Sequence, residues 1–281
     1  MFLILKDYGL NAPFNRKYSN KLLYGSFKTD FCLVTERMEE GSETAVVVKN
    51  LVKRFGAFTA VDGISFEINK GEVFGLIGPN GAGKTTTLRI ISTLLPPTSG
   101  EVRVFGNDIL RDADKIRRII SYLAEEAGTY RNISGKEYLS IIARIYFDSE
   151  EASKAVEEAI EFSGLGDRIN DKMKTYSKGM KRRIQIARVL MTKPKLAILD
   201  EPTAGLDVFH AQYIRNIIKK YAENGGTVIL SSHNMLEVEY LCSRVALMHQ
   251  GHIVIQDKPQ AIKNRLNASN LEEAFVKVVA S

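Results

Sequence analysis

The apolar positions of this 281-residue chain follow two alternating patterns from residue 45 onward. Short apolar runs bounded by turn residues are typical of buried strands, whereas apolar residues three and four positions apart are typical of helices. The first pattern predicts strands at 45–49, 64–68, 73–77, 119–123, 196–199, 227–230 and 245–248. The second predicts helices at 83–94, 135–147, 150–162, 178–191 and 208–223.

Strands that are apolar throughout and alternate with helices predict an α/β fold, with a mainly parallel sheet covered by helices on both faces. The stretch 112–178 is mostly helical, so we expect a helical subdomain inserted into this core. Residues 1–37 show neither spacing, and we hypothesise that Met38 is the natural start. The mass of protein from its native source tests this, and an intact chain beginning at Met1 would contradict it.

Charge and cysteine content narrow the possible functions. Of the net charge of +6, half lies in residues 1–37, where six basic residues face three acidic ones. The rest is spread over 244 residues, which is typical of a solvated surface rather than a nucleic-acid footprint, so we expect no nucleic-acid partner. Two cysteines, Cys32 and Cys242, are too few for a disulfide framework and favour a reducing compartment. No apolar run reaches the roughly 18–20 residues of a membrane-spanning helix.

A glycine-rich loop lies between the strand at 73–77 and the helix that follows it. Gly78, Gly83, Lys84 and Thr85 match the spacing G-x-x-x-x-G-K-[ST]. The glycines let backbone N–H groups turn toward phosphate oxygens, and the start of the helix adds the positive end of its dipole. Lys84 would contact the β and γ phosphates, and the Thr85 hydroxyl would bind Mg²⁺. A tight turn without a ligand is the alternative, but the setting favours a nucleoside triphosphate site. We expect the nucleotide to contact Gly78, Pro79, Asn80, Gly81, Ala82, Gly83, Lys84, Thr85 and Thr86.

Polar residues also follow two other apolar strands. Asp200 and Glu201 come directly after 196–199, at the sheet edge where open α/β folds bind ligands. Asp200 would hold Mg²⁺, and Glu201 would accept a proton from, or polarise, the water that attacks the γ phosphate. A plain strand end before a turn is the alternative. His233 follows 227–230 and would hydrogen-bond the γ phosphate and orient the water. We assign no role to His210, His249 and His252.

The order of these motifs resembles the nucleotide-binding domain of ATP-binding-cassette (ABC) transporters. The most specific element is Tyr-Ser-Lys-Gly-Met at 176–180, which resembles the family signature, usually Leu-Ser-Gly-Gly-Gln. Ser177 would cap a helix there, and backbone amides near Gly179 would face an anion. The resemblance implies that this anion belongs to ATP held by a second cassette, in a head-to-tail dimer. The residues expected to contact the partner's ATP are Ser177, Lys178, Gly179 and Met180.

The resemblance also implies an overall organisation. It predicts a P-loop NTPase core with an antiparallel β subdomain and the helical subdomain at about 112–178. The ABC ATPase domain would span 44–265, between a poorly ordered extension at 1–43 and a short helical tail at 266–281. The tail resembles that of drug- and ion-exporter cassettes.

Two further positions match the family pattern. Asp207, in the segment Ala-Gly-Leu-Asp, resembles the D-loop that communicates across the dimer. Phe55, 29 positions before Lys84, lies where the family places an aromatic that stacks on adenine; packing within the sheet is the alternative.

The chain departs from the family pattern in two places. Lys178 and Met180 replace a glycine and a glutamine of the signature. Glu125, with Glu126 as the other possibility, stands where the Q-loop glutamine that contacts Mg²⁺ and water is expected. A carboxylate there can bind the metal, but it adds negative charge close to the γ phosphate.

The resemblance implies the ATPase subunit of a transporter, with export favoured. The partners would be a second cassette and a separate integral membrane permease subunit, on the cytoplasmic face of the cell membrane. A soluble ABC-type ATPase acting on a ribosome or nucleic-acid machine is the alternative, and a third is a regulator that binds ATP without turnover. Lys84 and Ser177 are only 93 positions apart, which leaves no room for the long insertion typical of such soluble ABC-type ATPases. Glu201 and His233 argue against the third.

Overall fold

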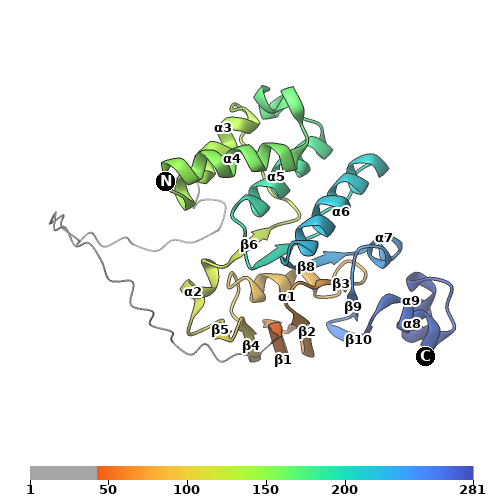
Figure 1. Cartoon of the computed structure of the whole chain (residues 1–281). Coiled ribbons are helices and arrows are strands. Elements are labelled where there is room, and N and C mark those ends of the chain that lie inside the picture. The colour runs from red at the N-terminus through yellow and green to blue at the C-terminus, as the bar shows by residue number, and fades with distance from the viewer. Residues whose placement is uncertain (1–42, 281) are drawn as a thin grey trace. The chain divides into compact units, whose positions relative to one another are not determined.

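The computed structural model describes residues 43–280, apart from the side chain of Glu237. The predicted start at Met38, and all of the predicted N-terminal extension except Glu43, lie outside the described residues. Two sheets and several layers of helix make up the described chain, which confirms the predicted α/β class (Figure 1). None of the helices between residues 43 and 280 is both long enough and apolar enough to cross a membrane.

The larger sheet has six strands in the order β10-β9-β3-β8-β7-β6. All neighbouring pairs are parallel except β10 and β9. Every residue of β3, β7 and β8 is buried, because helices or the second sheet cover both faces. The strands are β3 (Val73–Ile77), β6 (Ile120–Leu123), β7 (Leu196–Leu199), β8 (Thr227–Ser232), β9 (Arg244–His249) and β10 (His252–Asp257).

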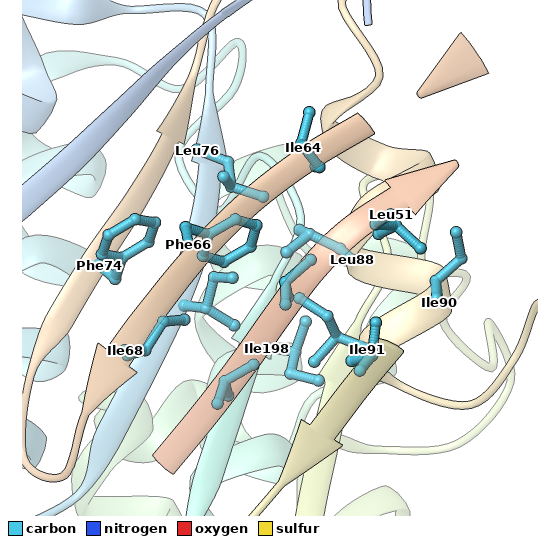
Figure 2. Close-up of a cluster of buried hydrophobic side chains, with 14 of the residues drawn as sticks. Leu51, Ile64, Phe66, Ile68, Phe74, Leu76, Leu88, Ile90, Ile91 and Ile198 are labelled. Carbon is cyan, nitrogen blue, oxygen red and sulfur yellow. The ribbon is translucent and has the colours of Figure 1, made fainter. Parts of the chain in front are cut away.

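The smaller sheet is antiparallel, with the order β2-β1-β4-β5. Its strands are β1 (Thr44–Phe55), β2 (Phe58–Asn69), β4 (Ser99–Val104) and β5 (Asn107–Asp108). Helix α1 (Lys84–Ile91) packs between the two sheets, and its Leu88 and Ile91 join the same core as Phe66 and Phe74 (Figure 2). The rings of Phe66 and Phe74 stack with their centroids 5.3 Å apart. This core holds the start of α1, and hence the glycine-rich loop, against the end of β3.

The remaining helices form two groups. Helices α3 (Gly135–Tyr146) and α4 (Ser149–Ser163) share a separate core with α5 (Lys178–Met191). The other face of α5 packs on the large sheet, together with helices α6 to α9. Those helices are α6 (Val208–Glu223), α7 (Met235–Glu239), α8 (Pro259–Leu266) and α9 (Leu271–Ala280). Helix α2 (Ala113–Arg117) precedes β6, and two 3-10 turns, Gly166–Asn170 and Met173–Thr175, precede α5.

The predicted elements agree unevenly with the structure. The bounds of β3, β7, α5 and α6 are those predicted, whereas β1 and β2 are several residues longer. Helix α1 ends at Ile91 rather than at residue 94, because Thr93 adopts a left-handed φ of 62°. The pattern missed the strands β4, β5 and β10 and the helices α2, α7 and α8. The helical subdomain predicted at about 112–178 contains β6, which belongs to the large sheet, so its boundary stays a prediction.

Candidate functional site

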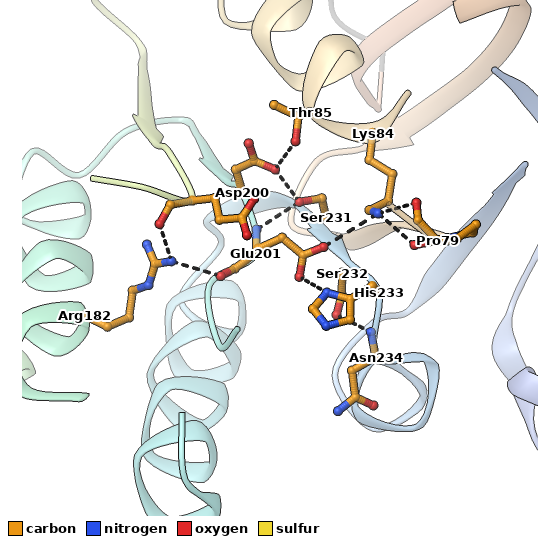
Figure 3. Close-up of polar contacts among 12 residues, drawn as sticks. Pro79, Lys84, Thr85, Arg182, Asp200, Glu201, Ser231, Ser232, His233 and Asn234 are labelled. Carbon is orange, nitrogen blue, oxygen red and sulfur yellow. Dashed lines mark hydrogen bonds and ion pairs between the residues drawn. The ribbon is translucent and has the colours of Figure 1, made fainter. Parts of the chain in front are cut away.

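Three parallel strands bring the predicted motifs to one edge of the large sheet. Strand β8 lies between β3 and β7, and its register pairs Ser232 with Ile77 and Leu230 with Leu199. The residues that follow each strand therefore meet at the same level, as Figure 3 shows for Lys84, Asp200, Glu201 and His233. Segments more than 100 positions apart along the chain thus form one polar cluster.

The glycine-rich loop is closely packed against its surroundings. A Cβ atom at Gly78 would lie 2.1 Å from the carbonyl oxygen of Met248, and one at Gly83 would lie 2.5 Å from that of Ala60. Gly83 also has a φ of 101°, which residues other than glycine rarely adopt. These two positions therefore require glycine, and through them the loop lies against β9 and β2.

Lys84 is folded back into this loop. Its ammonium donates hydrogen bonds to the carbonyl oxygens of Gly78 (2.7 Å) and Pro79 (3.0 Å), and it lies 3.7 Å from Glu201 Oε1. Burial lowers the pKa of Lys84, and the negative charges of Glu201 and Asp200 oppose this shift without cancelling it. A bound polyanion would add negative charge here and favour the ammonium form.

The Asp200 carboxylate accepts hydrogen bonds from three hydroxyl groups. Thr85 Oγ1 and Ser231 Oγ donate to its Oδ1 at 3.0 Å and 2.6 Å, and the Tyr122 hydroxyl donates to its Oδ2 at 3.2 Å. Burial, together with the negative charge of Asp200, raises the pKa of Tyr122 well above its ordinary value. Tyr122 therefore remains a neutral donor to this carboxylate.

Glu201 is held in an unusual backbone conformation. Its φ is 47°, in the left-handed region that non-glycine residues rarely adopt. Ser231 Oγ accepts a hydrogen bond from its N–H (2.9 Å), and Arg182 donates to its carbonyl oxygen (3.1 Å). Local strain of this kind persists where surrounding contacts impose it, and it often marks functional sites.

The Glu201 carboxylate has one partnered and one unpartnered oxygen. Oε2 lies 2.8 Å from His233 Nδ1, whose side chain is half exposed. Oε1 is buried and has no hydrogen-bond partner among the described residues; its nearest cation is Lys84, at 3.7 Å. A buried polar atom without a partner is costly. The arrangement therefore suits an additional polar group, such as a water or a phosphate, at this oxygen.

Sequence reasoning missed the part played by Arg182. This buried side chain donates to the carbonyl oxygens of Ala124 (3.1 Å), Glu125 (2.8 Å) and Glu201. Gln185, one turn further along α5, donates to the carbonyl oxygen of Ala127. Helix α5 thus holds both the loop after β6 and the loop after β7. The sequence offered little signal, because an arginine between Lys181 and Arg183 on a helix looks like part of a solvated face.

The other predicted residues lie outside this network. Ser177 caps α5 by accepting a hydrogen bond from the N–H of Met180 (3.2 Å), as predicted, and Asp207 caps α6. Phe55 is 48% exposed at the end of β1, and its stacking on adenine stays a prediction. Glu125 is exposed, and only its backbone is held, by Arg182.

A cavity of about 200 Å³ connects the catalytic candidates to the D-loop. Its lining includes Glu201, Ser232 and His233 as well as Thr203, Gly205 and Leu206. The predicted D-loop segment therefore lies next to the proposed reacting carboxylate in the same chain.

A divalent cation fits the Thr85 and Asp200 pair. A hydroxyl and a carboxylate are oxygen donors of the kind that Mg²⁺ takes, and these two are already in contact. No group of three or more Asp, Glu, His or Cys side chains that could hold a metal ion occurs in residues 43–280. Mg²⁺ in nucleotide sites doesn't require such a group, because phosphates and waters supply most of its ligands.

Comparisons with known proteins agree with this geometry. The family model described as "ABC transporter" matches residues 61–204. The linearmycin resistance ATP-binding protein LnrL of Bacillus subtilis (strain 168) is 40% identical over 242 residues, which cover 83% of this chain and 78% of LnrL. The daunorubicin/doxorubicin resistance ATP-binding protein DrrA of Streptomyces peucetius is 36% identical over 228 residues, covering 81% of this chain and 69% of DrrA.

A solved structure shows the same fold. It is a dimeric ATP-binding cassette in a post-hydrolysis state, bound to ADP and Pi, with a TM-score of 0.69 and 27% identity. The match covers 76% of this chain and 98% of that one. The fold is therefore that of an ABC ATPase cassette, within the P-loop NTPases, as the sequence predicted. The chain belongs to the ABC transporter family, as an ATP-binding subunit that hydrolyses ATP.

Proposed function

We propose that Lys84, Glu201 and His233 surround the γ phosphate and the attacking water. The observation that carries this proposal is the Glu201 carboxylate, which contacts His233 through one oxygen and presents the other, unpartnered, toward Lys84. Lys84 would exchange its loop carbonyl partners for phosphate oxygens. Glu201 would accept the proton of the water, and His233 would hold the carboxylate and the γ phosphate in register. The loop residues Gly78 to Thr86 would supply backbone N–H groups to the phosphates.

Thr85 and Asp200 would hold Mg²⁺ in this proposal. The metal would neutralise part of the phosphate charge when it is bound. Ser231 and Tyr122 keep Asp200 oriented by hydrogen bonding. Glu125 lies on the loop after β6, and its exposed carboxylate would approach the metal from that side. Phe55, half exposed at the edge of the small sheet, would stack on the adenine.

The signature and the D-loop would act on a second cassette. Ser177, Lys178 and the neighbouring amides of Gly179 and Met180 lie at a helix start, which attracts anions. Asp207 would contact the partner across the interface. The dimeric cassette bound to ADP and Pi supports such an assembly.

The relatives support export as the direction of transport. LnrL and DrrA are both named as resistance ATP-binding proteins, which supports export. The cassette would work with a separate integral membrane subunit, and would lie at the cytoplasmic face of the membrane. ATP binding would close the cassette pair and hydrolysis would reopen it, which drives the membrane subunit between its states. The relatives give no support to a role on a ribosome or nucleic acid.

Purification of the tagged chain from its native membranes tests the transporter assignment. We expect an integral membrane protein to co-purify with it in detergent, and the Glu201→Gln variant with ATP to retain that protein. Recovery of ribosomal particles instead would contradict the assignment. In parallel, the purified chain should hydrolyse ATP only when Mg²⁺ is present. Turnover by Glu201→Gln at the unaltered rate would show that the assigned base is wrong.

A further inference from the structure

His210, which was assigned no role from the sequence, lies directly against the signature. It is the third residue of α6, and helices α5 and α6 pack side by side. A Cβ atom at Gly179 would lie 1.8 Å from Cδ2 of the His210 ring and 2.3 Å from its Cγ. Only glycine leaves room for the imidazole at this position of α5. The ring therefore rests on the backbone of the signature.

The same histidine also contacts the D-loop. Its backbone N–H donates to Asp207 Oδ1 (2.9 Å), and its ring Nε2 lies 3.9 Å from Asp207 Oδ2. The side chain is only 25% exposed. His210 thus touches the cap residue of its own helix on one side and the signature glycine on the other.

A second contact joins a side chain at the start of α5 to the D-loop. A Cβ atom at Gly205, in the D-loop, would lie 2.2 Å from Lys178 Nζ. Gly205 has a φ of 65°, so the D-loop needs glycine there for its conformation, and the end of the flexible Lys178 side chain lies over it. A glycine thus lies under a side chain at both places: Gly179 of the signature lies under His210 of α6, and Gly205 of the D-loop lies under Lys178 of the signature.

Further along the same two helices lies a third contact. The guanidinium carbon of Arg183 is 3.9 Å from the centre of the Tyr213 ring, and the Tyr213 hydroxyl donates to the carbonyl oxygen of Phe162 (3.2 Å). Arg183 also donates to the carbonyl oxygen of Ser163 (2.7 Å). The end of α4 is thereby joined to both helices, so the α5–α6 contact continues into the helical subdomain.

We propose that His210 is a positioning residue that joins the signature to the D-loop, so that both motifs meet the partner cassette as one preformed unit. This inference rests on the proposed pairing of cassettes. Its physical basis is that groups ordered before association lose less conformational entropy when they bind. The lysine in place of a signature glycine fits the same scheme, because Lys178 extends over the D-loop of its own chain.

The test uses His210→Ala in the Glu201→Gln background, where ATP holds the pair closed. Alanine keeps the backbone N–H that Asp207 caps and is the best helix former, so only the ring is lost. We expect ATP-driven dimerisation to weaken by about fivefold or more, while the ATP affinity of the monomer is unchanged. His252→Ala, on the exposed edge of β10, is the matched control. Unchanged dimerisation of His210→Ala would overturn the proposal.

A double-mutant cycle tests the contact itself in the monomer. Gly179→Ala should lower the thermal unfolding midpoint in the parent chain, because its methyl group collides with the ring. In the His210→Ala chain, Gly179→Ala should lower the thermal unfolding midpoint by much less. Equal costs in both chains would show that the ring does not press on Gly179, and would overturn the proposal. If neither the Glu201→Gln chain nor its variants dimerise with ATP, the proposed pairing of cassettes is wrong. The inference is then wrong too, even if the double-mutant cycle shows that His210 and Gly179 are in contact.

Discussion

The strand edge and the α5–α6 contact position their functional groups by different means. At the strand edge, Asp200 and Glu201 are buried and bonded to residues of neighbouring strands. At the helix contact, the signature is exposed at Ser177 and Lys178, and side chains packed on glycines hold it. A β ladder fixes its register through hydrogen bonds, whereas packed helices can shift as bodies. Within one cassette, the reacting groups are therefore held by hydrogen bonds between strands, whereas the groups proposed to meet the partner are held by side-chain packing between two helices.

The largest expected effect lies at the strand edge, in Glu201→Gln. The substitution keeps the size and the His233 contact but removes the proton acceptor. We expect kcat to fall by about 10²–10⁴-fold, the usual contribution of a general base, with ATP binding retained. Steady-state hydrolysis and a nucleotide-binding titration on the same preparation measure the two quantities. Loss of binding together with turnover would mean that Glu201 is a structural residue instead.

Next comes Lys84→Ala, which removes the ammonium proposed to contact the phosphates of the ATP bound to the same cassette. A hydrogen bond to a charged group contributes about 1.5–3 kcal/mol, so ATP affinity should fall by about 10- to 150-fold. Fluorescent-nucleotide titration measures this. Lys178→Ala is the matched control for the comparison, since it removes a lysine from the helix side. The ATP affinity of the Lys178→Ala monomer should be unchanged. A loss of affinity equal to that of Lys84→Ala would contradict the distinction between the strand edge and the α5–α6 contact.

Ser231→Ala probes how the strand edge is held. The Ser231 hydroxyl donates to Asp200 and accepts from the N–H of Glu201, and it is fully buried. Its removal should lower the free energy of unfolding by about 1–3 kcal/mol, because buried polar groups lose their partner. Ser232→Ala is the control, as its hydroxyl accepts from the N–H of Asn234, two positions further along the chain. Denaturant unfolding of both variants measures the difference, and equal losses would deny Ser231 a special role.

The smallest effect is expected from Ser177→Ala, at the start of α5. Loss of the N-cap should cost about 0.5–2 kcal/mol of stability. Ser134→Ala, at the capping box of α3, should cost a similar amount. Dimerisation distinguishes the two variants. Only Ser177→Ala should weaken it, because Ser134 lies outside the signature. Equal dimerisation of the two variants would remove Ser177 from the proposed interface.

The uneven success of the sequence-based prediction has a physical cause. Strands β3 and β7 are buried throughout, so their apolar runs are continuous and their bounds are clear. Strand β10 is exposed or half buried along its length, and β4 begins with exposed residues. Strands with so many exposed positions carry at most a short apolar run, so the pattern does not reveal them.

The sequence alone determined the fold class, the phosphate loop, the acidic pair and the family, because these depend on residue types at short, fixed spacings. Only the tertiary structure decided how Glu201 is held. Its left-handed backbone depends on Ser231, 30 positions away, and on Arg182, 19 positions away. The contact between His210 and Gly179 likewise depends on how two helices pack. No local pattern encodes such contacts, since they arise when strand register and helix packing bring distant segments together.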